Sequence, residues 1–175
     1  DSPASIARSR IMFAVRAVRP LARAAPAVRA FSEAPAASVM TLNFSLPHMN
    51  IYADKTVDRV IIPGAEGVYG VTAGHTPIVS QLKPGVVEIV HEAAGEAEKY
   101  FVSGGFALTH DTSVTDISAF EAVKLDDLDA EAVKTQYSAA ASAFGSAAEG
   151  SAEKAAAGVQ MDTAKAMGDA LGVAL

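Results

Sequence analysis

Residues 63–77 read PGAEGVYGVTAGHTP and are followed at 82–90 by LKPGVVEIV. In this stretch, short runs that contain Val, Ile and Tyr alternate with pairs that contain Gly and Pro, and such pairs are strong local signals of turns. The run GVYGVT at 67–72 and the run GVVEIVH at 85–91 have the length and composition of strands. The stretch therefore predicts strands joined by tight turns.

The same pattern continues on both sides of this stretch. Strand-like runs recur about every 8 to 12 residues, and no helix-like segment separates them, which favours an antiparallel sandwich or barrel. The predicted sandwich domain spans residues 41–120. Its further strands are expected at 41–46, 56–62, 97–103, 105–110 and 112–118, with a hairpin loop at 92–96.

The last third of the chain has a different composition. Residues 121–175 are rich in Ala, Lys and acidic residues and contain no Pro. We expect Asp126 or Asp127 to cap a first helix and Ser151 to cap a second. Two helices with a short break at 145–150 should lie antiparallel. The predicted fold class is therefore α+β, an N-terminal antiparallel β-sandwich followed by a C-terminal two-helix antiparallel hairpin. Side chains at helical spacing form a stripe of Val133, Tyr137, Ala141 and Phe144 in the first helix and one of Val159, Thr163, Met167, Leu171 and Leu175 in the second. The contact faces of the two helices are expected to be mostly Ala and other small residues, which permit close approach but bury little area.

The beginning of the chain differs from the rest in charge. Residues 1–32 carry six Arg and one acid, a formal charge of +5, whereas residues 33–175 sum to −11. An Arg-rich, Ser-containing segment that is poor in acids is typical of an organelle transit peptide. We therefore expect a mitochondrial transit peptide at 1–32 and a small-residue linker at 33–40, with a retained basic arm as the alternative. The acidic remainder argues against binding to nucleic acid.

The sequence offers little material for catalysis or metal binding. There is no Cys, and no two His stand at ligand spacing, so the common zinc ligand sets are missing. The glycines in 64–70 lack the Lys-Ser/Thr of a phosphate-binding loop. We therefore assign no catalytic, cofactor-binding or metal-binding residue, and expect a non-enzyme without a cofactor. The four histidines are His48, His75, His91 and His110.

No apolar run reaches the roughly 18 to 20 residues that span a bilayer, so we expect no direct insertion into a membrane.

Several segments, in order along the chain, resemble one known family. They are the two quoted stretches at 63–77 and 82–90, then KYFVSGGFALT at 99–109 and AFEAVKLDDLD at 119–129. Over residues 41–135 the chain resembles the delta subunits of mitochondrial F-type ATP synthase, which are homologous to bacterial and chloroplast epsilon subunits. The resemblance implies a central-stalk rotor subunit that couples rotation of the membrane c-ring to the gamma subunit, and so proton flow to ATP synthesis. It implies no catalysis by the subunit itself.

The resemblance also implies partners and a location. The partners are the gamma subunit, the c-ring and the small mitochondrial epsilon subunit, and the location is the matrix side of the inner membrane within the ATP synthase complex. By the family's pattern, the loop at Glu66 faces the ring, and the turn that ends at Pro77 lies near the ring and gamma. The alternatives are a solvated acid at Glu66 and a His75 that hydrogen-bonds its own loop. The residues implied in ring or gamma contact are Glu66, Gly67, Val68, Tyr69, Gly70, Gly74, His75, Thr76 and Pro77.

Two other functions stay open beside the rotor role. Some bacterial relatives bind ATP on the hairpin through an acid followed three residues later by Arg-Ala, whereas here Asp129 precedes AEAVK and residues 121–175 contain no Arg. In some, a basic final helix inhibits ATP hydrolysis, but residues 146–175 contain two Lys and four acids. An acidic helix suits an acidic catalytic groove poorly. A regulatory subunit whose hairpin inhibits hydrolysis or senses ATP is the alternative, and a free-standing matrix enzyme is the third reading.

Overall fold

The computed structural model describes residues 39–175. The transit peptide expected at 1–32 and nearly all of the linker expected at 33–40 lie outside the described residues. The described part contains ten strands, a short 3-10 helix and two α-helices. The strands are β1 (Met40–Ser45), β2 (Asn50–Val57), β3 (Arg59–Gly64), β4 (Gly67–Thr72), β5 (Ile78–Leu82), β6 (Gly85–Val90), β7 (Ala97–Val102), β8 (Gly105–Thr109), β9 (Val114–Ala119) and β10 (Ala122–Lys124). The helices are η1 (Leu125–Asp127), α1 (Ala130–Ser146) and α2 (Ala152–Leu171).

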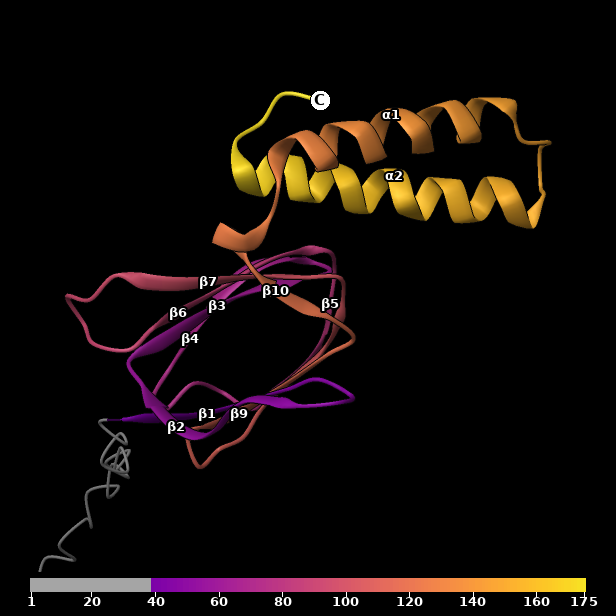
Figure 1. The fold of residues 1–175 in the computed structure, drawn as a ribbon. Helices are drawn as coiled ribbons and strands as arrows, with labels where there is room; N and C mark the ends of the chain where they lie inside the picture. Colours follow the sequence, from indigo (N-terminus) through magenta and orange to yellow (C-terminus); the bar gives the residue numbers. More distant parts are fainter. Residues whose placement is uncertain (1–38) are drawn as a thin grey trace, which may run out of the picture. The chain divides into compact units, whose positions relative to one another are not determined.

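The strands form the two layers of a sandwich (Figure 1). One layer has the order β4-β3-β6-β7-β10 and the other the order β5-β8-β9-β1-β2. The layers are joined at one paired position, Gly64 opposite Leu82. The predicted class, a sandwich followed by a two-helix hairpin, is confirmed. One ladder departs from the antiparallel expectation, because β1 runs parallel to β9. Turn signals report on strands adjacent in sequence, so they carried no information about this distant pair.

The core lies between the two layers and follows strand alternation. In β1, the side chains of Met40, Leu42 and Phe44 are fully buried, and those between them are only half-buried. Tyr100 of β7 reaches Phe44 from the facing layer, with the two rings edge to face and their centroids 5.6 Å apart. Each such buried side chain contributes about 1.5–3 kcal/mol relative to exposure. A shift of β1 by one residue would expose this whole set, so its burial specifies the register.

Three strands were not predicted, or only in part. In β2 the pattern is irregular, since its ladder with β1 has register shifts and Asp54 has a φ of 50°. In β5 the side chains of Ile78, Val79 and Gln81 are exposed, so period-two alternation is absent. β10 has three residues, too few to show a period.

The helix caps correct one prediction and confirm another. Asp126 and Asp127 lie in η1 and do not cap α1. The N-cap is Asp129, whose carboxylate accepts a hydrogen bond of 2.9 Å from the backbone N–H of Glu131. Ser151 caps α2 as predicted, because its hydroxyl accepts from the N–H of Lys154 at 3.1 Å. A cap satisfies backbone donors that the first turn leaves free.

The contact face of α2 consists of small residues, as predicted, but it does not follow the apolar stripe. The buried residues are Ala157, Ala164 and Gly168, whereas Val159, placed in the stripe, is 67% exposed. Small residues let the axes of two helices approach closely, and that contact outweighs the larger apolar side chains here. A Cβ on Gly168 would lie 2.5 Å from Leu175 Cδ1, so the end of the chain packs on that position. The hairpin touches the sandwich where α2 meets β6.

Candidate docking surface

The nine residues implied in ring or gamma contact fall into two groups. β3 and β4 pair from Gly64 opposite Gly67 at one end to Arg59 opposite Thr72 at the other. Glu66 lies in the turn at the first end, and residues 74–77 follow β4 beyond the second end. A strand of six residues at about 3.3 Å per residue is about 20 Å long. The turns that hold Glu66 and residues 74–77 therefore lie at opposite ends of β4, and Gly67 to Gly70 lie in the strand itself.

Four residues of the first group, Glu66 to Tyr69, line a groove of about 510 Å³ between the β3–β4 turn and β5, and Gly70 lies outside it. At one end of the groove the backbone N–H of Ala65 donates to the carbonyl oxygen of Gln81 at 2.9 Å. Further along, the hydroxyls of Tyr69 and Ser80 form a hydrogen bond between the two strands. β4 and β5 form no ladder with each other in the described sheet. The lining residues are Gly64, Ala65, Glu66, Gly67, Val68, Tyr69, Ile78, Val79, Ser80 and Gln81.

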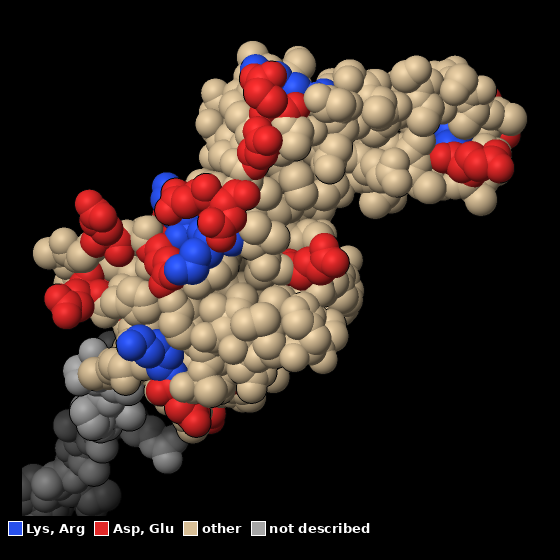
Figure 2. All heavy atoms as spheres, in the orientation of Figure 1, with Lys and Arg blue, Asp and Glu red and all other residues tan. Residues whose placement is uncertain are grey.

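An exposed apolar face adjoins this groove on β5 and β8. Val79 pairs with Leu108, and Gln81 pairs with Phe106, so Val79, Leu108 and Phe106 lie on the same outward face. Val79 is 71% exposed and Phe106 is 54% exposed, and Val68 at the edge of the groove is 66% exposed. Large apolar side chains gathered on a surface indicate a protein–protein contact. In the view of Figure 2, broad areas carry no Lys, Arg, Asp or Glu.

These apolar residues are the part of the surface that the sequence analysis missed. Residues 105–110 were predicted as a strand, but none of its side chains was assigned to the outer face. In β8 the burial alternates, with Gly105, Ala107 and Thr109 inward and Phe106 and Leu108 outward. Small residues inward and large apolar residues outward are the reverse of the usual alternation. That reversal was the signal in the sequence.

The second group forms a hydrogen-bonded turn between β4 and β5. Gly74 has a φ of 75° and donates its backbone N–H to the hydroxyl of Ser113 at 2.9 Å. The Nδ1 atom of His75 lies 2.8 Å from the carbonyl oxygen of Thr76. His75 is half-buried and bonds to its own loop, as one of the two interpretations of this residue required. Pro77 follows and ends the turn before β5.

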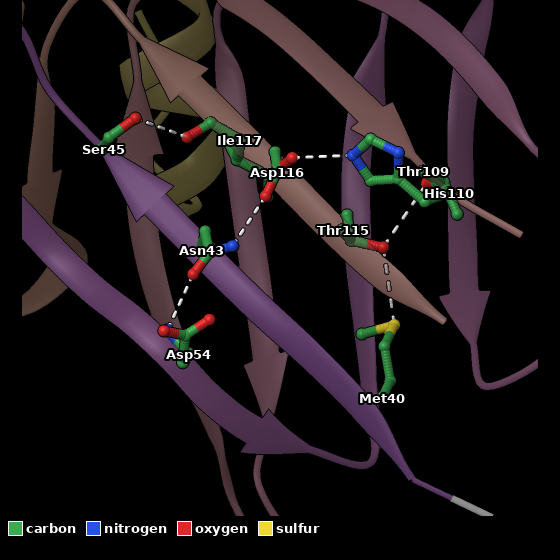
Figure 3. Close-up of polar contacts among 9 residues, drawn as sticks. All are labelled: Met40, Asn43, Ser45, Asp54, Thr109, His110, Thr115, Asp116 and Ile117. Carbon is green, nitrogen blue, oxygen red and sulfur yellow. Dashed lines mark hydrogen bonds and ion pairs between the residues drawn. The ribbon is translucent and has the colours of Figure 1, made fainter. Parts of the chain in front are cut away.

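A chain of polar contacts crosses the outer side of four strands (Figure 3). Asn43 donates to Asp116 Oδ1 at 2.7 Å and accepts from the backbone N–H of Asp54 at 2.7 Å. The Nε2 atom of His110 lies 2.8 Å from Asp116 Oδ2. Burial raises the pKa of Asp116, but the hydrogen bonds from Asn43 and His110 outweigh it and hold the pKa below its usual value. These contacts tie β2, β1, β9 and the end of β8 together.

A second polar cluster surrounds Glu98 on β7. Its carboxylate accepts from Lys124 Nζ at 2.8 Å, from the hydroxyl of Tyr100 at 2.9 Å and from the hydroxyl of Tyr52, and His91 Nε2 lies 3.3 Å away. Burial opposes ionisation of Glu98, but these partners, Lys124 foremost, lower its pKa to about 2. Burial and the neighbouring carboxylate raise the pKa of Tyr52. The cluster connects β2 of one layer with β7 and β10 of the other.

Neither polar cluster has the form of a catalytic or metal site. Within residues 39–175, no group of three or more His, Cys, Asp and Glu is arranged to hold a metal ion. None of the described helices is both long enough and apolar enough to pass through a bilayer. The feature with a clear chemical capability is the partly apolar surface formed by the groove, in which Glu66 is the one charged lining residue, and the outer face of β5 and β8.

Comparisons with known proteins agree with this fold. Residues 39–124 match the family described as ATP synthase, Delta/Epsilon chain, beta-sandwich domain. The delta subunit of the mitochondrial ATP synthase F(1) complex from Dictyostelium discoideum is 42% identical over 147 residues, which cover 83% of this chain and 85% of that protein. The mitochondrial ATP synthase delta subunit of Eremothecium gossypii is 40% identical over 162 residues, which cover 91% of this chain and 99% of that protein.

A solved structure extends the comparison to three dimensions. A chain of the Euglena gracilis mitochondrial ATP synthase, from a cryo-EM structure of OSCP, F1 and the c-ring, is similar with a TM-score of 0.74 and 30% identity, covering 81% of this chain and 87% of that one. The sandwich followed by a helical hairpin thus defines the class of delta/epsilon-type subunits. Within that class, this chain belongs to the family of mitochondrial ATP synthase delta subunits.

Proposed function

We propose that the chain is a rotor subunit of the central stalk of mitochondrial ATP synthase. It turns with the c-ring and the gamma subunit and couples the rotation of one to the other, so that proton flow drives ATP synthesis. The observation that carries the proposal is the exposed apolar surface of β5 and β8 beside the groove, in a chain of this family. The subunit is structural and does not itself catalyse a reaction.

The division of the docking surface between partners follows the resemblance to the family. The turn at Glu66, with Gly67 and Val68, meets the c-ring, and the turn from Gly74 to Pro77 lies near the ring and gamma. The flank of β5 and β8, whose exposed residues are apolar, packs on gamma. The small mitochondrial epsilon subunit binds the same chain, and the whole assembly lies on the matrix side of the inner membrane.

The construction of the sandwich suits a part that transmits torque. Protein interiors are packed as densely as organic crystals and have low compressibility, so a sandwich resists shear between its layers. The Glu98 cluster adds hydrogen bonds between the layers, and the contacts around Asn43 join neighbouring strands of one layer. Strands that are held both by packing and by such contacts transmit force without a change of register.

The proposal is tested by recovering the partners of the chain. A tagged chain is expressed in mitochondria and isolated in mild detergent, and the proteins bound to it are quantified by mass spectrometry. We expect near-stoichiometric gamma and ring subunits, and the same spectra show whether residues 1–32 remain. Recovery of the chain alone, or with soluble metabolic enzymes, would contradict the rotor role.

A matched pair of variants connects this assay to the surface. Val79→Asp places a charge on the exposed apolar face, and we expect it to reduce recovery of gamma at least tenfold, because the carboxylate would be desolvated on docking. Thr56→Asp places the same charge on an exposed position of β2 and should leave recovery unchanged. Both side chains point to solvent, so the free chain should unfold at the wild-type temperature in each case. Equal recovery with both variants would contradict docking through β5 and β8.

A further inference from the structure

Strand β4 is an edge strand that lacks the usual protection. In the described sheet it pairs only with β3, so its other edge carries backbone groups with no ladder partner. Proteins usually protect such an edge with charged residues, Pro or a bulge, because an open edge pairs readily with another chain. The sequences of β4 (GVYGVT) and β5 (IVSQL) contain no charged residue and no Pro. No charged residue and no Pro in these two strands would therefore oppose pairing of the β4 edge with another chain.

The glycine in the middle of β4 has no explanation within this chain. Gly70 lies opposite Ile61 of β3 and is not among the residues with a positive φ. A Cβ built on Gly70 would meet no atom within 4 Å. Neither the backbone conformation nor the packing thus requires Gly at this position, although Gly weakens a strand. A Gly in a strand often marks a place where another backbone approaches closely.

The groove beside the free edge of β4 indicates the chemistry of a segment that would fit there. Its lining is uncharged except for Glu66, which stands in the turn at one end. Val68 and Val79 present exposed apolar side chains along it, and Tyr69 and Ser80 occupy its floor with their hydroxyls bonded to each other. Such a lining fits an extended apolar segment, and the carboxylate of Glu66 fits a Lys or Arg at one end of that segment.

We propose that an extended apolar segment of a partner subunit pairs with the free edge of β4 through main-chain hydrogen bonds. A basic residue at one end of the segment lies beside Glu66, and an apolar side chain of the segment covers the outer face of Gly70, in space that a side chain at position 70 would occupy. The inference rests on the proposed function, because the segment belongs to a subunit of the central stalk. It adds the mode of recognition, in which backbone pairing supplies the contact and the apolar lining selects the segment.

Residue-resolved hydrogen exchange tests the pairing directly. The amides of β4 are compared between the free chain and the purified ATP synthase that contains it. In an antiparallel edge strand, every second N–H points to the neighbour and the others point outward. We therefore expect alternate amides of β4 to exchange rapidly in the free chain and at least a hundredfold more slowly in the complex. The amides of β2, the edge strand of the other layer, should exchange equally in both.

The outcomes of the exchange experiment distinguish failure of the β4 pairing from failure of the proposed function. Rapid exchange of β4 amides in a complex that retains the chain would overturn the pairing and leave the proposed function intact. Protection that appears in the free chain as its concentration rises would identify a second copy as the occupant and would also overturn it. Failure of the chain to enter the complex would overturn the proposed function, and the inference with it.

A pair of glycine variants provides an independent check in the full chain. Gly70→Val and Gly145→Ala each add a side chain where a Cβ meets nothing within 4 Å, one in β4 and one in α1. We expect Gly70→Val to fold normally and to lower incorporation into the complex at least tenfold in competition with the wild-type chain. Gly145→Ala should compete equally. Equal competition by Gly70→Val would overturn the packing of a partner side chain over Gly70.

Discussion

Replacement of Gly105 by Ala tests the packing between β8 and β9. Gly105 has a φ of 147°, and a Cβ there would lie 2.2 Å from the carbonyl oxygen of Ser118 and 2.8 Å from the Cα of Ala119. Both contacts are with backbone, so the strands must separate locally. The unfavourable φ costs about 1–3 kcal/mol, and loss of one ladder hydrogen bond adds about 1 kcal/mol. We expect Gly105→Ala to lower the free energy of unfolding by about 3 kcal/mol.

Urea unfolding followed by tyrosine fluorescence measures this change. The chain has no Trp, and Tyr52, Tyr69 and Tyr100 lie in the sandwich, so the signal reports mainly on that domain. With a slope of about 2 kcal/mol per molar urea, the midpoint should fall by about 1.5 M. Gly70→Ala is the control, because its added methyl meets nothing, and it should stay within about 0.5 kcal/mol of wild type. A Gly105→Ala midpoint as close to wild type as that of the control would refute the reasoning.

Three further predictions follow from the polar groups. Glu98→Gln should destabilise the chain at pH 7 by about 1 kcal/mol. The pKa of Glu98 is lowered to about 2 in the folded chain, below the value near 4.3 in the unfolded chain. The stabilisation by this carboxylate is therefore complete above about pH 4.3 and is lost as the pH falls toward 2. Urea unfolding should therefore show a smaller difference in the free energy of unfolding between Glu98→Gln and wild type at pH 3 than at pH 7. An equal difference at both pH values would contradict the prediction. Asn43→Ala removes two hydrogen bonds and should lower the free energy of unfolding by about 2 kcal/mol, whereas Asn50→Ala at an exposed position of β2 should change it very little. Equal midpoints of urea unfolding for the two variants would show that the contacts of Asn43 are not stabilising. Asp129→Ala removes the N-cap of α1 and should cost the hairpin about 1 kcal/mol in thermal unfolding by circular dichroism, and a similar loss in Asp127→Ala would dispute the cap assignment.

Local patterns predicted the elements whose signals are local. The run at 67–72 became β4 with the same bounds, because Gly-containing turns precede and follow it. Ser151 was identified as a cap because a capping side chain acts on the N–H groups two or three residues ahead. Asp129 was not, because three acids within four residues offered equivalent candidates, and η1 decided among them. Its 3-10 turn delays the start of α1 and places the third acid at the cap.

Features that depend on distant partners were beyond the sequence. The direction of β1 is set by its ladder with β9, and no turn joins these two strands. The abundance of Ala predicted a contact face of small residues between the helices, but helical spacing did not show that Val159 of the apolar stripe would face solvent. The candidate contacts at Glu66 and His75 came from family resemblance, while Val79 and Phe106 emerged only when the register of β5 with β8 was known.

Some glycines of the sandwich are required by the fold, because no side chain would fit at their positions, and one is not. At Gly105 the chain supplies the reason itself, since backbone atoms of β9 occupy the space that a side chain would fill. At Gly64 the reason is similar, because a Cβ there would lie 2.9 Å from the carbonyl oxygen of Gly67. Gly70 has open space around it and an ordinary backbone conformation, so stability of the isolated chain would favour almost any β-branched residue there. Because the same strand has an unpaired and uncharged edge, the cost of Gly70 to the free subunit is best understood as a contribution to an interface that forms only in the complex.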